Sequence, residues 1–413
     1  MIASGGLACD TSATGDEGGS DEEVTIRVAL WDYSNVDYYK TMFAAFEEDY
    51  PNIKIDPVEF AADEYPTVVT TQLAGKQDFD VVFHKTLADL SGLINQGHIK
   101  PVTDYIEETE DFNPDSYSGL LDALVVDGET YGLPYRKDNY LLYYNKDLFD
   151  QAGVDYPEDG MNLEEYGALA EKMTSGEGND KVYGTHFHIW PGVITNMIRR
   201  TERYSPVDTS TFDNIEPLYD FVIDLQDRGI IQDFGTLQSG NIHYSGVFYN
   251  QQAAMIQIGT WFTNMLLENA EFNWGAVTLP NDDGVVNETG VGSITPASLG
   301  EYAKHPDEGW IALQYICGEA GALVLAETGI LPAYTSDAIN GIFDAMPETN
   351  DYAPENFSKY IDIPKYITEF PMDPNGATIN NILDEQHSSI MTKSVSIREG
   401  LDGLIERVND VQD

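Results

Sequence analysis

The stretch VTIRVAL at residues 24–30 opens the segment that decides the fold, because its apolar residues alternate and it is rich in β-formers, which predicts a strand. Residues 38–50 carry apolar side chains at helical spacing, and IKIDPV at residues 53–58 predicts a second strand. Residues 65–73 again have helical spacing, and DVVF at residues 80–83 predicts a short buried strand. This alternation of strands and helices predicts an α/β fold with a mostly parallel sheet flanked by helices.

The rest of the chain extends the same pattern. LLYYNKD at residues 141–147 predicts a strand and its turn, and Asn162 is a candidate N-cap for a helix over residues 163–173. A further strand is expected at residues 274–280 and a long amphipathic helix at residues 306–325. With 413 residues, 42% of them hydrophobic, the chain is long enough for two domains with ordinary cores.

The balance of charge limits the partners. The chain has 21 Lys and Arg against 71 Asp and Glu, a formal net charge of −50. A surface this negative repels phosphate backbones and anionic membranes, so nucleic-acid binding is excluded as a function. Most of these carboxylates are interpreted as serving solubility or adaptation to salt, and the charge favours a neutral or cationic ligand.

Residues 1–23 are predicted to be a lipoprotein-type N-terminal remnant followed by a flexible acidic tether. Gly6-Leu7-Ala8-Cys9 resembles the end of a bacterial lipoprotein signal, which makes Cys9 the candidate lipidation site, with a chance cysteine in a tail as the alternative. Cys317 lies in an apolar helical run and is expected to be a buried free thiol. Two cysteines predict neither a disulfide framework nor a zinc site, and no apolar run is long enough to span a bilayer.

Five segments, taken in order, carry a family resemblance. They are YPNI at residues 50–53, FDVVF at 79–83, the DG, YGLP and YNKDLF motifs within 127–149, the AAM and GTW motifs within 253–261, and GILPA at 329–333. From about Val24 to its C-terminus the chain resembles the family 1 extracellular solute-binding proteins, the group of the maltose-binding protein. Each motif alone is weak, but the ordered set is specific.

This resemblance implies a two-lobed periplasmic-binding-protein-like fold whose lobes are discontinuous in sequence and close like a hinge. The first lobe is expected to comprise residues 24–136 and 291–340, and the second residues 137–290 and 341–413. It also implies that a sugar, in this case an oligosaccharide, is captured in the interlobe cleft and delivered to the membrane permease subunits of an ABC importer. The expected protein is a monomer without cofactor, metal or catalytic residues, held at the outer face of the cytoplasmic membrane as a lipoprotein.

A sugar presents apolar C–H faces and a rim of hydroxyls, so its site needs aromatic platforms and polar side chains on loops that follow sheet strands. Trp31, Asp32 and Tyr33 directly follow the first strand and combine these features, although Trp31 could instead cover the edge of the lobe. His84 and Lys85 follow the strand at residues 80–83, and one of them is expected to face the cleft.

The crossovers between the lobes supply further candidates. The resemblance places ligand-contacting polar groups at the first crossover, where Arg136 and Asp138 lie, with an interlobe salt bridge as the alternative. Ser293 lies at the second crossover, where the chain is expected to line the cleft together with Gly292.

The second lobe is expected to supply the main aromatic platforms. Alternation puts His188 and Trp190 on one face of a strand-to-loop segment, with Trp190 as a stacking residue and His188 as a partner for hydroxyls. Trp261 follows a Gly-Thr turn at the start of a helix, and the resemblance assigns it to stacking on sugar, which makes it the first choice among the site residues. Tyr366 or Phe370 is a candidate for a last aromatic.

Three alternatives remain from the sequence. A secreted glycoside hydrolase needs two carboxylates at a set separation, and 71 acidic residues supply such a pair by chance. No G-x-S-x-G, H-E-x-x-H or phosphate-loop motif supports an enzyme. A binder of a peptide, a polyamine or ferric ion is the second alternative, and a polyamine would suit the negative charge. A surface protein with no small ligand is the third, and it predicts no aromatic cleft.

Overall fold

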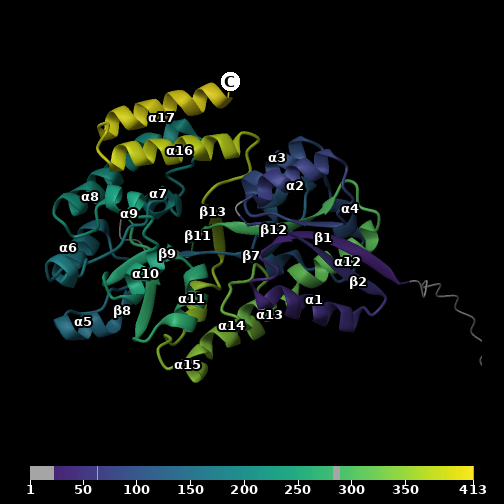
Figure 1. The fold of residues 1–413 in the computed structure, drawn as a ribbon, viewed down its shortest axis with the longest axis horizontal. Coiled ribbons are helices and arrows are strands. Elements are labelled where there is room, and N and C mark those ends of the chain that lie inside the picture. Colours follow the sequence, from purple (N-terminus) through teal and green to yellow (C-terminus); the bar gives the residue numbers. More distant parts are fainter. Residues whose placement is uncertain (1–22, 63, 282–288, 413) are drawn as a thin grey trace, which may run out of the picture.

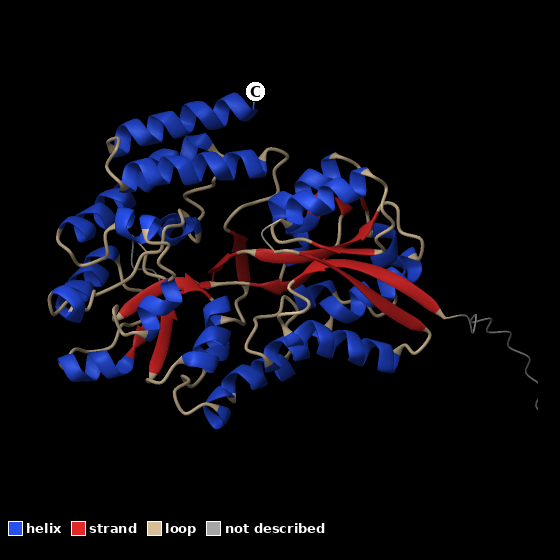
Figure 2. Cartoon of the chain, viewed as in Figure 1, coloured by secondary structure: helices blue, strands red, loops and turns tan. Residues whose placement is uncertain are grey.

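The computed structural model describes residues 23–62, 64–281 and 289–412 and places them in two lobes that lie side by side (Figure 1). Cys9, the predicted lipidation site, lies outside the described residues. Both lobes combine a sheet with surrounding helices, as the sequence predicts (Figure 2).

The first lobe is built on a six-stranded sheet in the order β2-β1-β3-β12-β4, with β7 also paired to β12. β1 runs parallel to β2 and β3, whereas β12 is antiparallel to β3, β4 and β7. The strands are β1 (Val24–Trp31), β2 (Ile53–Phe60), β3 (Val81–Phe83), β4 (Ile99–Lys100), β7 (Leu133–Lys137) and β12 (Ile294–Gly300), and a small hairpin adds β5 (Val125–Val126) and β6 (Glu129–Thr130).

Helices cover both faces of this sheet, with α2 and α3 on one side and α1 and α12 on the other (Figure 1). Apolar side chains at helical spacing, such as Tyr39, Met42 and Phe46 of α1, are buried against the strands. The helices of this lobe are α1 (Asp37–Asp49), α2 (Tyr65–Ala74), α3 (Leu87–Asn95), α4 (Thr103–Glu108), α12 (Pro306–Cys317) and α13 (Glu319–Glu327), with 3₁₀ turns η1 (Pro114–Tyr117) and η2 (Leu120–Leu124).

Both sheets differ from the mostly parallel sheet that was expected in each lobe. The first is mixed, because β12 is antiparallel to β3, β4 and β7. The second has three strands in the order β10-β8-β9, and all of them are antiparallel. The reason is that β8 (Tyr140–Asn145) enters from the first lobe, while β9 (Met255–Gly259) and β10 (Trp274–Thr278) run back against it. Pairing of Tyr140 with Gly259 therefore brings the end of β9 to the point where β8 begins.

Helices surround this smaller sheet, and the two C-terminal helices α16 and α17 pack together along one side of the lobe (Figure 1). The elements are α5 (Lys146–Ala152), α6 (Leu163–Met173), η3 (Gly178–Asp180), α7 (Gly192–Arg199), η4 (Thr209–Ile215), α8 (Glu216–Asp227), α9 (Phe234–Ser239), α10 (Tyr244–Tyr249), α11 (Trp261–Asn269), α14 (Asp337–Asp344), α15 (Met346–Thr349), η5 (Phe357–Tyr360), α16 (Gly376–Met391) and α17 (Ile397–Gln412).

Short links join the lobes. Asp138 and Asn139 separate β7 from β8, and Ser293 separates β12 from β11 (Thr289–Gly292), which pairs in parallel with β13 (Lys365–Thr368). Asn139 ties the links together, because its side chain accepts from the Val291 amide at 3.0 Å and donates to the Tyr360 carbonyl at 2.9 Å.

The buried side chains form three clusters. One lies within the first lobe and a second within the second lobe, while the third combines Ala322 and Ala326 of α13 with residues of all three strands of the second sheet. Cys317 is a free, buried thiol of the first cluster, as predicted, and burial raises its pKa.

Among the described residues, no single helix is long and apolar enough to cross a membrane. The bent pair α12 and α13, with 43° between its helices, passes that test together by length and composition only, and several of its apolar residues are buried in the protein's own cores.

Candidate functional site

A cavity of about 640 Å³ lies between the lobes. The first lobe contributes Pro66 and the segment Lys85–Asp89 at the start of α3, and Ser293 and Ile294 line it from the second link. The remaining lining residues come from the second lobe and include Trp190, Trp261, Tyr140, Asn196 and Glu369. The cavity therefore meets the geometric requirement for a ligand enclosed by two lobes.

Two tryptophans form the aromatic wall of the cavity. The ring centroids of Trp190 and Trp261 are 6.1 Å apart with 59° between the planes. Gly259 makes this arrangement possible, because a Cβ at that position would lie 1.9 Å from the Trp261 ring. The Trp261 indole donates to the Tyr244 hydroxyl at 3.0 Å, while Trp190 stays 38% exposed and available to a ligand.

The Glu369 carboxylate lies beside these rings, is held in place by three neighbours, and is called the floor of the cavity below. Glu369 accepts from the Asn196 amide at 3.1 Å and from the Tyr140 hydroxyl. Gly192, at the start of α7, leaves room for it, because a Cβ there would lie 3.1 Å from a Glu369 carboxylate oxygen. Burial raises the pKa of Glu369 and the nearby Asp138 carboxylate adds to this, whereas the Asn196 hydrogen bond opposes it.

The links lie directly behind this floor. Ser293 donates to the Asp138 carboxylate at 3.1 Å, and the Tyr366 hydroxyl donates to the backbone carbonyls of both residues. Gly292 packs so closely against Asp138 that a Cβ would lie 1.9 Å from the Asp138 carbonyl oxygen. Burial raises the pKa of the Asp138 carboxyl, and the charge of Arg136 opposes that shift.

The structure brings four of the predicted site residues to the cavity. Trp190, Trp261, Lys85 and Ser293 all line it, and so does Phe370, the candidate for a last aromatic. The Lys85 ammonium donates to the Ala62 carbonyl at 2.6 Å and lies 5.4 Å from the centre of the Trp31 ring.

Trp31, the last residue of β1, and the next two residues, Asp32 and Tyr33, do not line the cavity in this structure. Trp31 is only 8% exposed and packs against Tyr65 with ring centroids 5.0 Å apart. Tyr33 stacks on Phe43, and Asp32 forms a tight turn with a positive φ of 57°. Ligand contact by Trp31, Asp32 and Tyr33 stays a prediction.

Four other predicted residues do not line the cavity either. His84 is buried at 1% exposure, and His188 packs edge-on against Trp190 with ring centroids 4.4 Å apart. The Arg136 guanidinium donates to Thr295 at 3.2 Å, and Asp138 is buried at the first link. His188 and Asp138 therefore support residues that line the cavity, and direct ligand contact by any of the four stays a prediction.

Sequence reasoning missed the polar side chains from α7 and α16. Thr195, Asn196, Asn380, Asn381 and Asp384 line the cavity, although they lie within helices that look like ordinary surface or core segments in the sequence. The one usable signal was Trp190-Pro191-Gly192, an aromatic residue immediately before a helix N-terminus, because ligands of α/β proteins bind where loops lead into helices.

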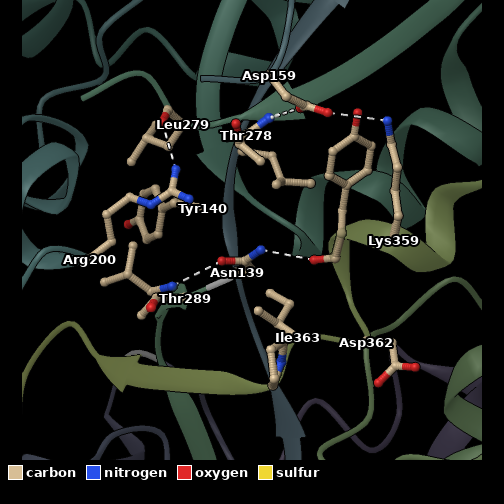
Figure 3. A pocket seen from close by; sticks show the side chains of 14 residues that line it. Asn139, Tyr140, Asp159, Arg200, Thr278, Leu279, Thr289, Lys359, Asp362 and Ile363 are labelled. Atoms are coloured by element: carbon tan, nitrogen blue, oxygen red, sulfur yellow. Dashed lines mark hydrogen bonds and ion pairs between the residues drawn. The ribbon is translucent and has the colours of Figure 1, made fainter. Parts of the chain in front are cut away.

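A second cavity, of about 390 Å³, borders the links, and Figure 3 shows Asn139 in its wall. An ion pair between Lys359 and Asp159, at 3.3 Å, closes part of it. None of the described residues that line this cavity is a tryptophan, so the larger cavity fits the chemistry of a sugar better. Among the residues that the structure describes, no group of three or more His, Cys, Asp or Glu could hold a metal ion.

Comparison with known proteins places the chain in a family. The model of the bacterial extracellular solute-binding protein family matches residues 34–322. The chain belongs to this family of solute-binding proteins. A putative binding protein of Brucella abortus is 23% identical over 309 residues, which cover 71% of this chain and 72% of the relative.

Solved structures agree with the two-lobed fold. A sugar transporter from Rhizobium etli, in an open conformation, is 30% identical with a TM-score of 0.83 and covers 93% of this chain and 99% of its own. A substrate-binding protein of an ABC transporter from Listeria monocytogenes, in complex with cycloalternan, has a TM-score of 0.78 at 19% identity and covers 95% of this chain and 99% of its own.

The sn-glycerol-3-phosphate-binding periplasmic protein of Escherichia coli is also similar, at 23% identity over 76% of this chain and 75% of the relative. The family match agrees with the resemblance seen in the sequence. The similar proteins, however, are named for different ligands, from sugars to sn-glycerol 3-phosphate.

Proposed function

We propose that the protein captures a sugar, in particular an oligosaccharide, in the interlobe cavity and delivers it unaltered to the membrane subunits of an ABC importer. The observation that carries this proposal is the tryptophan pair Trp190 and Trp261, which lines one side of a cavity whose other side belongs to the first lobe. Aromatic faces match the apolar C–H faces of a sugar ring, and the surrounding amide, hydroxyl and carboxylate groups match its hydroxyls.

The names of two structural relatives, a sugar transporter and a protein in complex with cycloalternan, support a carbohydrate ligand. The proposal includes a monomer at the outer face of the cytoplasmic membrane, anchored through a lipid on Cys9. Mass spectrometry of protein purified from membranes tests that anchor, since a diacylglyceryl group on Cys9 would change the mass of the N-terminal peptide.

Isothermal titration calorimetry against a panel of mono- and oligosaccharides tests the binding function. Chromatography of the ligand after incubation tests the hydrolase alternative, because an enzyme releases shorter products and a binding protein returns the ligand intact. Binding without turnover is the expected result. Release of products would overturn the transport role.

Trp190→Ala provides the matched test of the site. Loss of one stacking face is expected to weaken binding of the best ligand by about 1 kcal/mol, or about five-fold in Kd. Tyr352→Ala is the control, because Tyr352 is 37% exposed against 38% for Trp190 but does not line the cavity. Equal affinities of the two variants would remove Trp190 from the site.

A further inference from the structure

The charged side chains that line the interlobe cavity are predominantly acidic. One of them is a cation, Lys85, and three are carboxylates, Asp89, Glu369 and Asp384. Lys85 is already engaged, because its ammonium donates to the Ala62 carbonyl and lies over the Trp31 ring. A negatively charged ligand would therefore meet three carboxylates and one cation that is held by the first lobe.

Two arginines, Arg199 and Arg136, lie near the floor, and the charge of Arg136 offsets part of that of Asp138. Arg199 donates to the backbone carbonyls of Thr368 and Tyr204, and the Arg136 guanidinium donates to Thr295. Neither arginine lines the cavity among the described residues. A phosphate or carboxylate group would thus find no free guanidinium for the two-pronged hydrogen bonding that such groups favour.

Glu369 is the carboxylate best placed to recognise a ligand. Hydrogen bonds from Asn196 and Tyr140 and the close approach of Gly192 fix its position. Its partner Tyr140 also packs edge-on against Trp261, with ring centroids 5.5 Å apart, so Glu369 lies beside the aromatic wall. A second carboxylate, Asp138, lies close enough behind Glu369 to raise its pKa. Because Arg136 offsets part of the charge of Asp138, Glu369 is the carboxylate in the cavity wall that favours a ligand with positive charge.

We propose, building on the sugar-binding function above, that the ligand is a saccharide carrying a protonated amine, with the ammonium group bound by Glu369 and a ring face placed on the tryptophan pair. An ammonium donates charge-assisted hydrogen bonds to a carboxylate and is attracted to the faces of tryptophan rings. The same arrangement rejects sugar phosphates and uronic acids, since these would add negative charge beside Glu369 and Asp384.

Calorimetry on the unaltered protein tests the ligand class with matched probes. The probes are glucose, glucosamine, N-acetylglucosamine and glucose 6-phosphate, the corresponding galactose series, and the β-1,4-linked glucosamine disaccharide with its di-N-acetyl form. Acetylation removes the positive charge and keeps the ring. In the series that binds best, the free amine is expected to bind about ten-fold or more tightly than the acetylated form, and only the amine should weaken markedly with added salt.

The outcomes separate this inference from the proposed function. Neutral or acetylated sugars that bind as tightly as the amine, or a phosphate ester that binds tightly, would overturn the amine preference and leave sugar binding intact. Failure of every saccharide in this panel and in the wider panel above would overturn both.

Glu369→Gln tests the residue, because the amide keeps the size and can still accept from Asn196. In this variant the amine and its acetylated form are expected to bind with similar affinities, so that the roughly ten-fold ratio between them is lost whatever the absolute affinity. Glu319→Gln is the control, since Glu319 is exposed on α13 and its replacement changes the net charge equally. A preference that survives Glu369→Gln would remove Glu369 from this role, and if that variant does not fold, the salt dependence of the unaltered protein decides.

Discussion

Gly292→Ala is expected to force apart the two links between the lobes. A Cβ at this position would lie 1.9 Å from the Asp138 carbonyl oxygen, 2.6 Å from the Asp138 carbonyl carbon and 2.9 Å from the Tyr366 hydroxyl. Close contact between carbon and oxygen needs about 3.3 Å, so the links must separate by about 1.4 Å at this point. Because two of the atoms belong to backbone, rotation of a side chain cannot relieve the clash.

The cost has two measurable parts. Overpacking of this kind costs typically about 1–3 kcal/mol, which urea unfolding would report as a lower midpoint with an unchanged slope. Displacement of Asp138 also disturbs its hydrogen bonds with Ser293 and Tyr366, so affinity for the best sugar should fall as well. Gly341→Ala in α14 is the control, because nothing lies within 4 Å of a Cβ there. A Gly292→Ala protein with the stability and affinity of the parent would refute the close packing of the links.

Three further outcomes are expected. Gly259→Ala should displace the Trp261 ring, which a Cβ would approach to 1.9 Å, and so weaken sugar binding about five-fold or more and alter tryptophan fluorescence; an unchanged Kd would contradict this. Burial lowers the pKa of His84 to about 3 from an ordinary 6.5, so the unfolded chain binds the extra proton as pH falls through that window, and the fold loses stability there. Between about pH 7 and pH 5, His84 should lower the free energy of unfolding by about 2 kcal/mol. In urea unfolding, the free energy of unfolding of His84→Leu should fall by that much less over the same pH range, and an identical pH dependence of the two proteins would exclude His84 as the cause. The net charge of −50 should make the melting temperature rise with sodium chloride up to about 1 M, and a flat profile would show that self-repulsion does not limit stability.

The first lobe could be predicted closely because its signals are local. Strands and helices between Val24 and Asn95 follow from alternation and helical spacing, and Thr86 completes a capping box with Asp89 at the start of α3. Trp31 shows what the local pattern leaves open. The sequence allowed either ligand contact or a role at the edge of the lobe, and in this structure Tyr65 packs against its ring and leaves little of it exposed, so ligand contact by Trp31 stays a prediction.

The second lobe depended on contacts that no local pattern encodes. The antiparallel pairing of β8 with β9 follows from the direction in which the chain enters the lobe, and this pairing brings Tyr140 beside Trp261. Glu369 meets Asn196 across 173 positions of sequence, so neither residue could be linked to the site beforehand. Trp190 and Trp261 could be predicted individually, Trp190 from alternation in a strand-to-loop segment and Trp261 from the family resemblance.

The third buried cluster has a mechanical consequence. Ala322 and Ala326 belong to a helix that follows the first sheet, yet they are packed among the side chains of the other sheet, and the Asn264 amide of α11 also donates to the Thr328 carbonyl at 2.6 Å. None of these four residues lines the interlobe cavity. We therefore expect the cavity to open and close by a rotation of one lobe against the other that leaves these contacts in place.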